Sequence, residues 1–208
     1  MTLSPQFLAQ KLVELAYDAA AAGRLWVAFS GGVDSAVLLH LASRMNDGAA
    51  VSAVHVDHGL APESGEWAQR ARAFAARLGV DFVTLQATVE ESGAGLEAAA
   101  REARYLAFES VLEPGDWLLS AHHEDDQAET LLLHLFRGSG VLGLAGIAAV
   151  RECGAGRLAR PLLDVSREEI LAYAARHDLT WTEDPSNRDH RFDRNYLRHA
   201  VMPVSYTH

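Results

Sequence analysis

The run Leu25-Trp26-Val27-Ala28-Phe29 passes without a break into the polar loop Ser30-Gly31-Gly32-Val33-Asp34-Ser35. An apolar run of this kind, with no polar residue alternating through it, is typical of a strand buried in a parallel sheet. Residues 36–45 follow the loop with the apolar content of a helix. Strand, loop and helix in this order form the unit from which a doubly wound α/β fold is built.

The same alternation extends outward from this unit. We expect helices at residues 6–21, 64–78, 96–112 and 125–136, and strands at residues 51–56, 81–85 and 117–121. Such alternation predicts a doubly wound parallel sheet with helices on both faces, in the α/β class. Ligands of these folds bind at the carboxyl ends of the strands, so the loops that follow strands carry the functional information.

The organisation changes after residue 138. A glycine-rich stretch over residues 138–156 leads to a short strand or hairpin at residues 157–163, and helices are expected at residues 166–177 and 192–201. We therefore place a nucleotide-binding domain at residues 1–147. Residues 148–208 are expected to be a small, mostly helical C-terminal extension of the same catalytic region.

The composition limits the classes of protein to which this chain can belong. The chain has 208 residues, of which 49% are hydrophobic, and one cysteine, Cys153. This content supports a packed core, and a single cysteine excludes an internal disulfide and any site built from several thiolates. No apolar run is long enough to span a bilayer, and the N-terminus lacks the pattern of a signal peptide. We expect a cytoplasmic location with no membrane partner.

The charges are unevenly distributed along the chain. The formal net charge is −10, and residues 1–150 hold 9 basic against 19 acidic side chains. Residues 151–208 hold 9 of each, and every basic residue there is arginine. Arginine suits bidentate phosphate contacts, so this segment is the better candidate for a contact with nucleic acid. An ordinary solvated surface is the alternative.

The glycine-containing loop has the chemistry of a phosphate site. Paired glycines allow a tight turn whose backbone N–H groups approach an anion, and the next helix points its N-terminus at the same place. The hydroxyls of Ser30 and Ser35 add donors. No lysine follows, so the loop is not a Walker A motif, and it also lacks the dinucleotide spacing G-x-G-x-x-G. The alternative is a tight turn capped by Asp34 or Ser35.

Two further strand ends carry polar clusters. The second strand ends in His55-Val56-Asp57-His58-Gly59-Leu60, which is either part of a ligand site or a hydrogen-bonded turn. The fourth ends in Ala121-His122-His123-Glu124-Asp125-Asp126-Gln127-Ala128-Glu129-Thr130. Asp126 and Glu129 are three residues apart, which places them on one helix face. They suit an ammonium ligand or Mg²⁺, although acidic residues in a first helical turn can also serve as partners of the helix dipole.

These motifs resemble known enzymes. The loop at residues 30–35 is similar to the pyrophosphate loop of the N-type ATP pyrophosphatase superfamily, whose fold is adenine-nucleotide alpha-hydrolase-like. Across roughly residues 24–203 the chain resembles the tRNA(Ile)-lysidine synthetase family. The likeness rests on residues 30–35, 55–60, 99–105, 121–130, 136–147, 160–163, 183–187 and 194–198.

The resemblance implies an ATP-dependent carbon–nitrogen ligase that modifies tRNA. Such an enzyme adenylates the wobble cytidine of an isoleucine tRNA and then joins free L-lysine to it, releasing pyrophosphate and AMP. ATP and Mg²⁺ are the implied substrate and cofactor. ATP would be bound by Ser30, Gly31, Gly32, Val33, Asp34, Ser35, His55 and Val56. The implied catalytic residues are Asp34, Arg104 and Asp126, with Asp34 also holding Mg²⁺, and the implied lysine-binding residues are Asp125, Asp126 and Glu129.

Arginines recur near the end of the chain at residues 188, 191, 194 and 198. On a helix, Arg188, Arg191, Arg194 and Arg198 would form one stripe, for which we predict contact with tRNA phosphates. Ion pairs with Asp189 and Asp193 are the alternative. Members of the resembled family often continue into further tRNA-binding domains, and we expect this chain to stop before them.

Three other readings remain open. Related sulfur-transferring tRNA enzymes share the loop but depend on several cysteines, so the lone Cys153 disfavours them. Other adenylating synthetases share the loop but not residues 136–198. A nucleotide-binding module without chemistry would need the loop alone. A homodimer is a further open alternative.

Overall fold

The computed structural model describes residues 2–45, 48–59, 63–89, 95–138, 145–182 and 193–202. Within these stretches, six strands form one sheet in the order β3-β2-β1-β4-β6-β5. Their bounds are β1 Leu25–Ala28, β2 Val51–Asp57, β3 Asp81–Gln86, β4 Trp117–Leu119, β5 Val150–Cys153 and β6 Gly156–Ala159. Neighbouring strands are parallel except β5, which pairs antiparallel with β6. The predicted α/β fold is confirmed, with one antiparallel edge strand.

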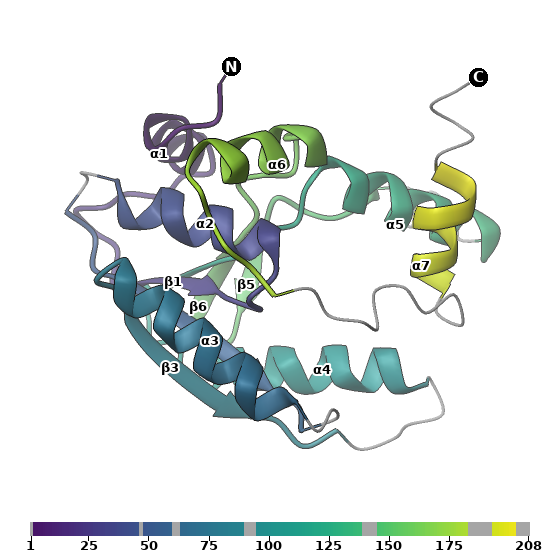
Figure 1. Ribbon diagram of the computed structural model, residues 1–208, viewed down its shortest axis with the longest axis horizontal. Coiled ribbons are helices and arrows are strands. Elements are labelled where there is room, and N and C mark those ends of the chain that lie inside the picture. Colours follow the sequence, from purple (N-terminus) through teal and green to yellow (C-terminus); the bar gives the residue numbers. More distant parts are fainter. Residues whose placement is uncertain are drawn as a thin grey trace.

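Helices cover both faces of this sheet, as expected. They are α1 Pro5–Glu14, α2 Val33–Ser43, α3 Ser64–Arg77, α4 Leu96–Glu109, α5 Glu124–Phe136, α6 Arg167–Arg176 and α7 Asp193–Tyr196, with a π-helical turn, η3, at Leu197–Val201. Figure 1 shows α2 beside α6 on one side of the sheet and α4 on the opposite side. The face that carries α2 and α6 holds the larger hydrophobic core, and α4 closes a smaller one.

The burial of β1 explains its unbroken apolar sequence. Leu25 and Val27 lie in the larger core, whereas Trp26 between them lies in the smaller core on the other face. A central strand with both faces covered has no side on which a polar residue would be solvated. This is the physical basis of the pattern from which the fold was predicted.

The first helix is shorter than predicted. It ends at Glu14 rather than near residue 21, and Ala16 adopts a left-handed φ of 65°. The turn directs Tyr17 into the core, where its ring meets Trp117 edge-on at 5.5 Å between centroids. Burial of one aromatic ring therefore overrides a helical pattern that continued in the sequence.

The hairpin after residue 147 belongs to the same sheet. Its second strand, β6, was expected near residues 157–163, but its first strand, β5, lies inside the stretch assigned to a glycine-rich loop. Parallel pairing of β6 with β4 extends the sheet across the boundary placed at residue 147. Residues on either side of that boundary thus share one sheet.

The strand order fixes the location of the functional loops. Connections from β1 through β2 to β3 run in one direction along the sheet, and β4 returns to pair with the other side of β1. The carboxyl ends of β1 and β4 are therefore neighbours at a topological switch point, where open α/β sheets bind ligands. In the part of the chain that the structure describes, no helix is long and apolar enough to cross a membrane.

Candidate active site

The loop between β1 and α2 is held in shape by its own polar groups. Gly31 has a φ of 90°, a conformation that a side chain would strain. The Ser30 hydroxyl accepts a hydrogen bond from the Gly32 N–H at 3.3 Å and contacts the Ser35 hydroxyl at 3.1 Å. The loop leads directly into α2, whose N-terminal N–H groups are oriented to bind an anion. The loop geometry leaves these N–H groups available for an anion, and the phosphate site stays a prediction.

Asp34 stands in the first turn of α2 with an unsatisfied carboxylate. Its Oδ1 atom is buried and has no hydrogen-bond partner among the described residues, and its Oδ2 atom lies 3.9 Å from Nε2 of His123. Burial raises the pKa of Asp34 above its ordinary value, and the nearby charges of His123 and Arg167 oppose that rise. A buried oxygen without a partner is costly, so a cation bound at this carboxylate would relieve the cost.

Mg²⁺ fits this arrangement. The ion is usually held by one or two carboxylates together with phosphate oxygens and water. Among the described residues, no group of three or more His, Cys, Asp or Glu side chains is arranged to hold a metal ion by itself. Asp34 would thus supply one protein ligand, and the remaining ligands would come from a phosphate-bearing substrate and water.

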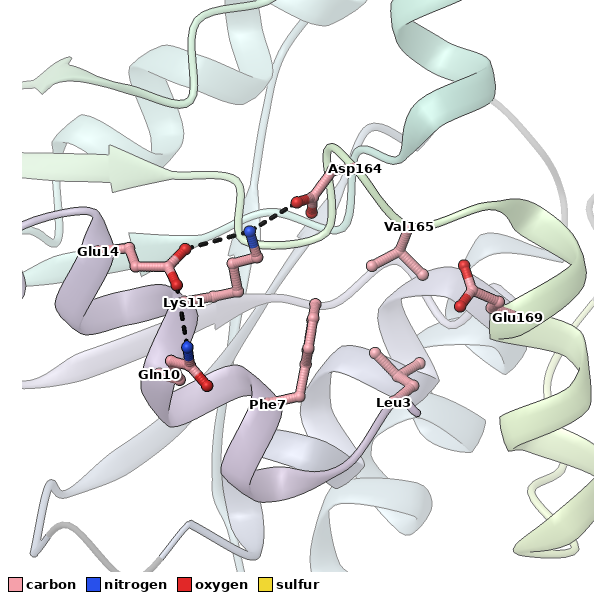
Figure 2. Close-up of a pocket in the computed structure, with 8 residues that line it drawn as sticks. All are labelled: Leu3, Phe7, Gln10, Lys11, Glu14, Asp164, Val165 and Glu169. Atoms are coloured by element: carbon pink, nitrogen blue, oxygen red, sulfur yellow. Dashed lines mark hydrogen bonds and ion pairs between the residues drawn. The ribbon is translucent and has the colours of Figure 1, made fainter. Parts of the chain in front are cut away.

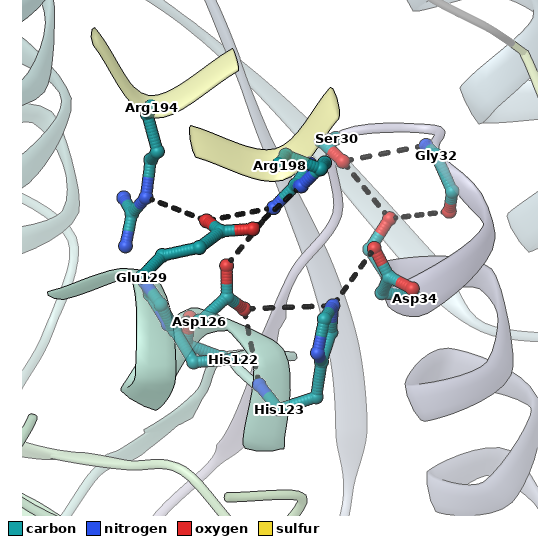
Figure 3. A network of polar contacts seen from close by, with 11 residues as sticks. Ser30, Gly32, Asp34, His122, His123, Asp126, Glu129, Arg194 and Arg198 are labelled. Atoms are coloured by element: carbon teal, nitrogen blue, oxygen red, sulfur yellow. Dashed lines mark hydrogen bonds and ion pairs between the residues drawn. The ribbon is translucent and has the colours of Figure 1, made fainter. Parts of the chain in front are cut away.

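His123 connects the loop to the cluster that follows β4. Its ring is 2% exposed, and Nε2 lies 3.9 Å from Asp34 Oδ2 and 3.6 Å from Asp126 Oδ2 (Figure 3). The neighbouring His122 turns elsewhere and contacts the Ser120 hydroxyl at 2.7 Å. Burial, above all, lowers the pKa of His122 to about 3, so its ring is neutral at pH 7. The rings of the two adjacent histidines therefore face different partners.

Asp126 stabilises the start of α5 and remains ionised. It accepts a hydrogen bond from the backbone N–H of His123 at 3.1 Å. Burial tends to raise the pKa of Asp126, but the interaction with His123, this hydrogen bond and the charge of Arg194 oppose it, and the pKa is lowered. Asp126 is therefore an anion at neutral pH, as the binding of a cationic substrate requires.

Glu129 is the centre of an ion-pair network that we name the arginine clasp, formed by Glu129, Asp126, Arg194 and Arg198 (Figure 3). Arg198 donates from Nε to Glu129 Oε1 at 2.7 Å and from Nη2 to Oε2 at 3.0 Å, and Nη2 is also 3.4 Å from Asp126 Oδ1. Arg194 donates from Nε to Glu129 Oε2 at 3.1 Å. Glu129 is fully buried, so two guanidiniums balance one desolvated carboxylate.

The arginine clasp contains Arg194 and Arg198, two residues that we predicted to contact tRNA. Arg194 and Arg198 are on a helical segment, as expected, but their guanidiniums turn onto α5 instead of forming a free outer stripe. Among the side chains that the structure describes, their carboxylate partners are Glu129 and Asp126. The predicted alternative partners, the side chains of Asp189 and Asp193, lie outside the described residues. Arg188 and Arg191 lie outside the described residues.

The other predicted site residues lie along the same edge of the sheet. His55 is buried, with Nδ1 2.8 Å from the Phe29 carbonyl, so its ring ties β2 to the start of the loop. Val56 is the next residue of β2. Arg104 lies on α4, and its Nε donates to His58 Nε2 at 3.4 Å. Asp125 lies in the first turn of α5, beside Asp126.

Two functional positions were missed by sequence reasoning. The sequence analysis gave His123 no individual role, although its place after β4 sets it beside the loop once β4 is paired with β1. Gln127 exchanges two hydrogen bonds with Ile147, at 2.7 and 2.8 Å, and so fixes the chain that returns to the sheet. No signal in the sequence identifies that pair, because the partner is a backbone group.

A separate hollow of about 230 Å³ lies beside α1 (Figure 2). It is lined by Leu3, Phe7, Gln10, Lys11, Glu14, Asp164, Val165 and Glu169. Lys11 contacts Asp164 at 2.6 Å and Glu14 at 3.1 Å, and Glu169 caps the start of α6. Lys11, Glu14, Asp164 and Glu169, the charged residues that line this hollow, thus already have polar partners. Among the described residues, Oδ1 of Asp34 has none. We therefore locate the active site at the switch point.

The chain was compared with known sequences. The family model described as "PP-loop domain" matches residues 5–205. A tRNA(Ile)-lysidine synthase of Alkalilimnicola ehrlichii is 52% identical over 205 residues, which cover 97% of this chain and 45% of that protein. One of Pseudomonas aeruginosa is 50% identical over 190 residues, covering 90% and 43%. The chain thus spans less than half the length of the curated relatives it matches.

Solved structures share the fold at low sequence identity. A U34-tRNA thiolase of Methanococcus maripaludis, solved with its 4Fe-4S cluster, matches with a TM-score of 0.65 and 16% identity over 97% of this chain and 75% of its own. An NH3-dependent NAD synthetase of Campylobacter jejuni gives a TM-score of 0.55 and 15% identity, covering 97% and 81%. These similarities show the fold alone.

Proposed function

Since this chain belongs to the PP-loop domain family, we propose that it is the ATP-using catalytic region of a tRNA(Ile)-lysidine synthetase. Its substrates would be ATP, an isoleucine tRNA with cytidine at the wobble position, and free L-lysine. The relatives named as tRNA(Ile)-lysidine synthase support this assignment over nearly the whole chain. The observation that carries the chemistry is the orphaned Oδ1 of Asp34, next to the loop and linked through His123 to Asp126.

In the first half-reaction, the cytidine O2 atom attacks the α-phosphorus of ATP and pyrophosphate leaves. The loop N–H groups and the N-terminus of α2 bind the departing phosphates. Mg²⁺, when bound by Asp34, neutralises charge on the phosphate oxygens. Arg104, on the same edge of the sheet, is proposed to stabilise the α-phosphate, and His55 and Val56 to lie beside the adenine.

In the second half-reaction, the lysine ε-amine attacks C2 of the cytidine and AMP leaves. The ammonium form of lysine has a pKa of about 10.4, so the protein must bind a cation and remove a proton. We propose that Asp126 holds the ammonium and then accepts its proton, because Asp126 is ionised and its contact with Arg198 is as long as 3.4 Å. We propose that Asp125, in the same helical turn, assists Asp126. Glu129 would act through the clasp, because both of its oxygens already accept hydrogen bonds from arginine.

We further propose that Arg188 and Arg191 contact tRNA phosphates, with Arg194 and Arg198 stabilising the segment that carries them. Replacing Arg191 with Ala should reduce the slope of log affinity against log salt by about one unit. An unchanged slope would exclude a phosphate contact at Arg191. A location in a reducing compartment such as the cytoplasm agrees with the single, buried, unpaired Cys153.

A pyrophosphate-release assay tests the proposal. The protein is incubated with ATP and Mg²⁺, alone, with an isoleucine tRNA carrying wobble cytidine, and with the same tRNA carrying uridine there. We expect pyrophosphate only with the cytidine-containing tRNA, and a loss of about 100-fold in Asp34→Asn, since the charge of a metal ligand is worth several kcal/mol. Release without tRNA, or with the uridine form, would contradict the assignment.

A further inference from the structure

Three arginines surround Tyr105 on the face of the sheet that α4 covers. The guanidinium carbon of Arg151 lies 4.4 Å from the centre of the Tyr105 ring, and that of Arg101 lies 5.1 Å from it. The Tyr105 hydroxyl is 3.4 Å from Nη2 of Arg101 and 3.5 Å from Nη2 of Arg160. The arginines come from α4, β5 and the residue that follows β6, so the fold brings together what the sequence separates.

Among the side chains that the structure describes, no carboxylate balances the charges of this cluster: none lies within ion-pair distance of Arg101, Arg151 or Arg160. Arg160 is 3% exposed, and its Nε atom is buried with no hydrogen-bond partner among the described residues. Burial lowers the pKa of Arg160, and among its neighbours Arg151 and Arg101 lower it further. Repelling cations held together in this way are stabilised when an anion binds.

The position of the cluster relates it to the active site. Arg160 follows the carboxyl end of β6, and β6 pairs with β4, whose carboxyl end leads to His122. The pKa of His122, which burial lowers most, is lowered further by the charges of Arg160 and Arg101, so these groups lie within electrostatic range of one another. The phosphate loop follows β1, on the other side of β4.

We propose that Arg101, Arg151 and Arg160 form a second anion site, which binds a backbone phosphate of the RNA strand next to the nucleotide being modified. The paired N–H groups of a guanidinium match the oxygens of a phosphate. Contacts with the ring and hydroxyl of Tyr105 position the three arginine side chains. This inference rests on the proposed function, because it assumes an RNA substrate.

The topology favours RNA over ATP as the source of this phosphate. The phosphates of ATP occupy the loop after β1, and the reacting nucleotide must reach that loop past His122 and His123. In the sheet, β4 lies between β1 and β6. An RNA strand that places its reacting nucleotide at the end of β4 would therefore bring a flanking phosphate toward the end of β6, where Arg160 lies. Contacts to phosphate position an RNA strand without reading its sequence, so this site would set the register of the substrate.

The test uses the double variant Arg101→Gln, Arg151→Gln, because both side chains reach Tyr105 from outside the core. Arg176→Gln, which removes an exposed arginine of α6, is the matched control. Binding of the isoleucine tRNA is measured by fluorescence anisotropy across a salt series, ATP binding by calorimetry, and folding by thermal unfolding. The parent protein is also assayed for tRNA-dependent pyrophosphate release.

We expect the double variant to unfold at the parent temperature, to bind tRNA about tenfold more weakly, and to lose about one unit of salt slope, while ATP affinity and the control stay unchanged. Parental tRNA affinity and slope would overturn the inference. So would a loss confined to ATP, which would assign the arginines to the nucleotide. Absence of pyrophosphate release by the parent would instead contradict the proposed function. In the double variant Arg101→Lys, Arg151→Lys, the salt slope of tRNA binding should return to the parental value because the charge is kept. Part of the loss of tRNA affinity should remain, because lysine cannot bind phosphate in a bidentate manner.

Discussion

At the scale of single residues, we expect Gly32 to be required for ligand binding but not for folding. A Cβ placed on Gly32 would meet the Ser30 hydroxyl at an ordinary 3.5 Å, so Gly32→Val should fold. The branched side chain would occupy the space where the loop N–H groups meet a phosphate. We expect ATP affinity measured by calorimetry to fall at least about tenfold, with thermal stability near that of the parent. Parental ATP affinity would exclude this loop as the phosphate site.

Asp34 should show a trade-off between stability and activity. Its pKa is raised by burial, so its ionised form destabilises the fold of the ligand-free protein. The group favours the folded state only below the ordinary aspartate pKa near 3.8, and this contribution is lost as pH rises through the higher folded value. Asp34→Asn should therefore unfold at a higher temperature than the parent at pH 7, and the difference should vanish near pH 3. A less stable variant at pH 7 would mean that Asp34 has a structural partner.

At the scale of elements, the arginine clasp attaches the last helix to α5. Removing both guanidiniums in Arg194→Ala, Arg198→Ala leaves the buried Glu129 carboxylate unpaired, which should cost about 3 kcal/mol in urea unfolding. Adding Glu129→Leu to that variant should recover much of the loss, because the uncompensated charge is then gone. Equal stability of the double variant and the parent would show that Glu129 is solvated in solution.

The packing of α2 on α6 should depend on pH through His40. Its Nδ1 lies 2.8 Å from the Tyr173 hydroxyl, and Arg44 donates to its Nε2 at 3.0 Å. Burial, then the charge of Arg44, lowers the pKa of His40 from 6.5 to about 4. The unfolded chain protonates His40 at a higher pH than the folded protein does. The free energy of unfolding therefore falls as the pH drops from 6.5 to about 4. From pH 7 to pH 5 the parent should lose about 2 kcal/mol more than His40→Gln. Equal losses would place His40 in solvent.

The elements also show what sequence alone could predict. The buried strands and α2 follow from runs of apolar residues, because burial on both faces leaves a direct trace in the sequence. The end of α1 and the edge strand β5 do not, because the first depends on where Tyr17 is buried and the second on a partner strand. In the site, the loop and Asp126 were predictable from local chemistry. The partners of Arg194 and Arg198, and the arginines around Tyr105, depend on tertiary contacts that the sequence does not display.

At the scale of the whole molecule, the order of the strands brings three kinds of chemistry to one edge of the sheet. The loop after β1 offers N–H groups for phosphate, the cluster after β4 offers carboxylates for a cation, and the end of β6 offers arginines for a second anion. The proposed two-step ligase would need such a division, because one of its proposed substrates is a polyanion and another is a cationic amine.

The most direct measurement follows the two steps separately. The protein is incubated with ATP, Mg²⁺ and the isoleucine tRNA without lysine, and the tRNA is isolated and analysed by mass spectrometry before and after lysine is added. We predict an adenylated wobble cytidine that lysine converts to a lysine adduct with release of AMP. In Asp126→Ala the adenylated tRNA should accumulate. A parent protein that transfers no adenylyl group to this cytidine would contradict the account.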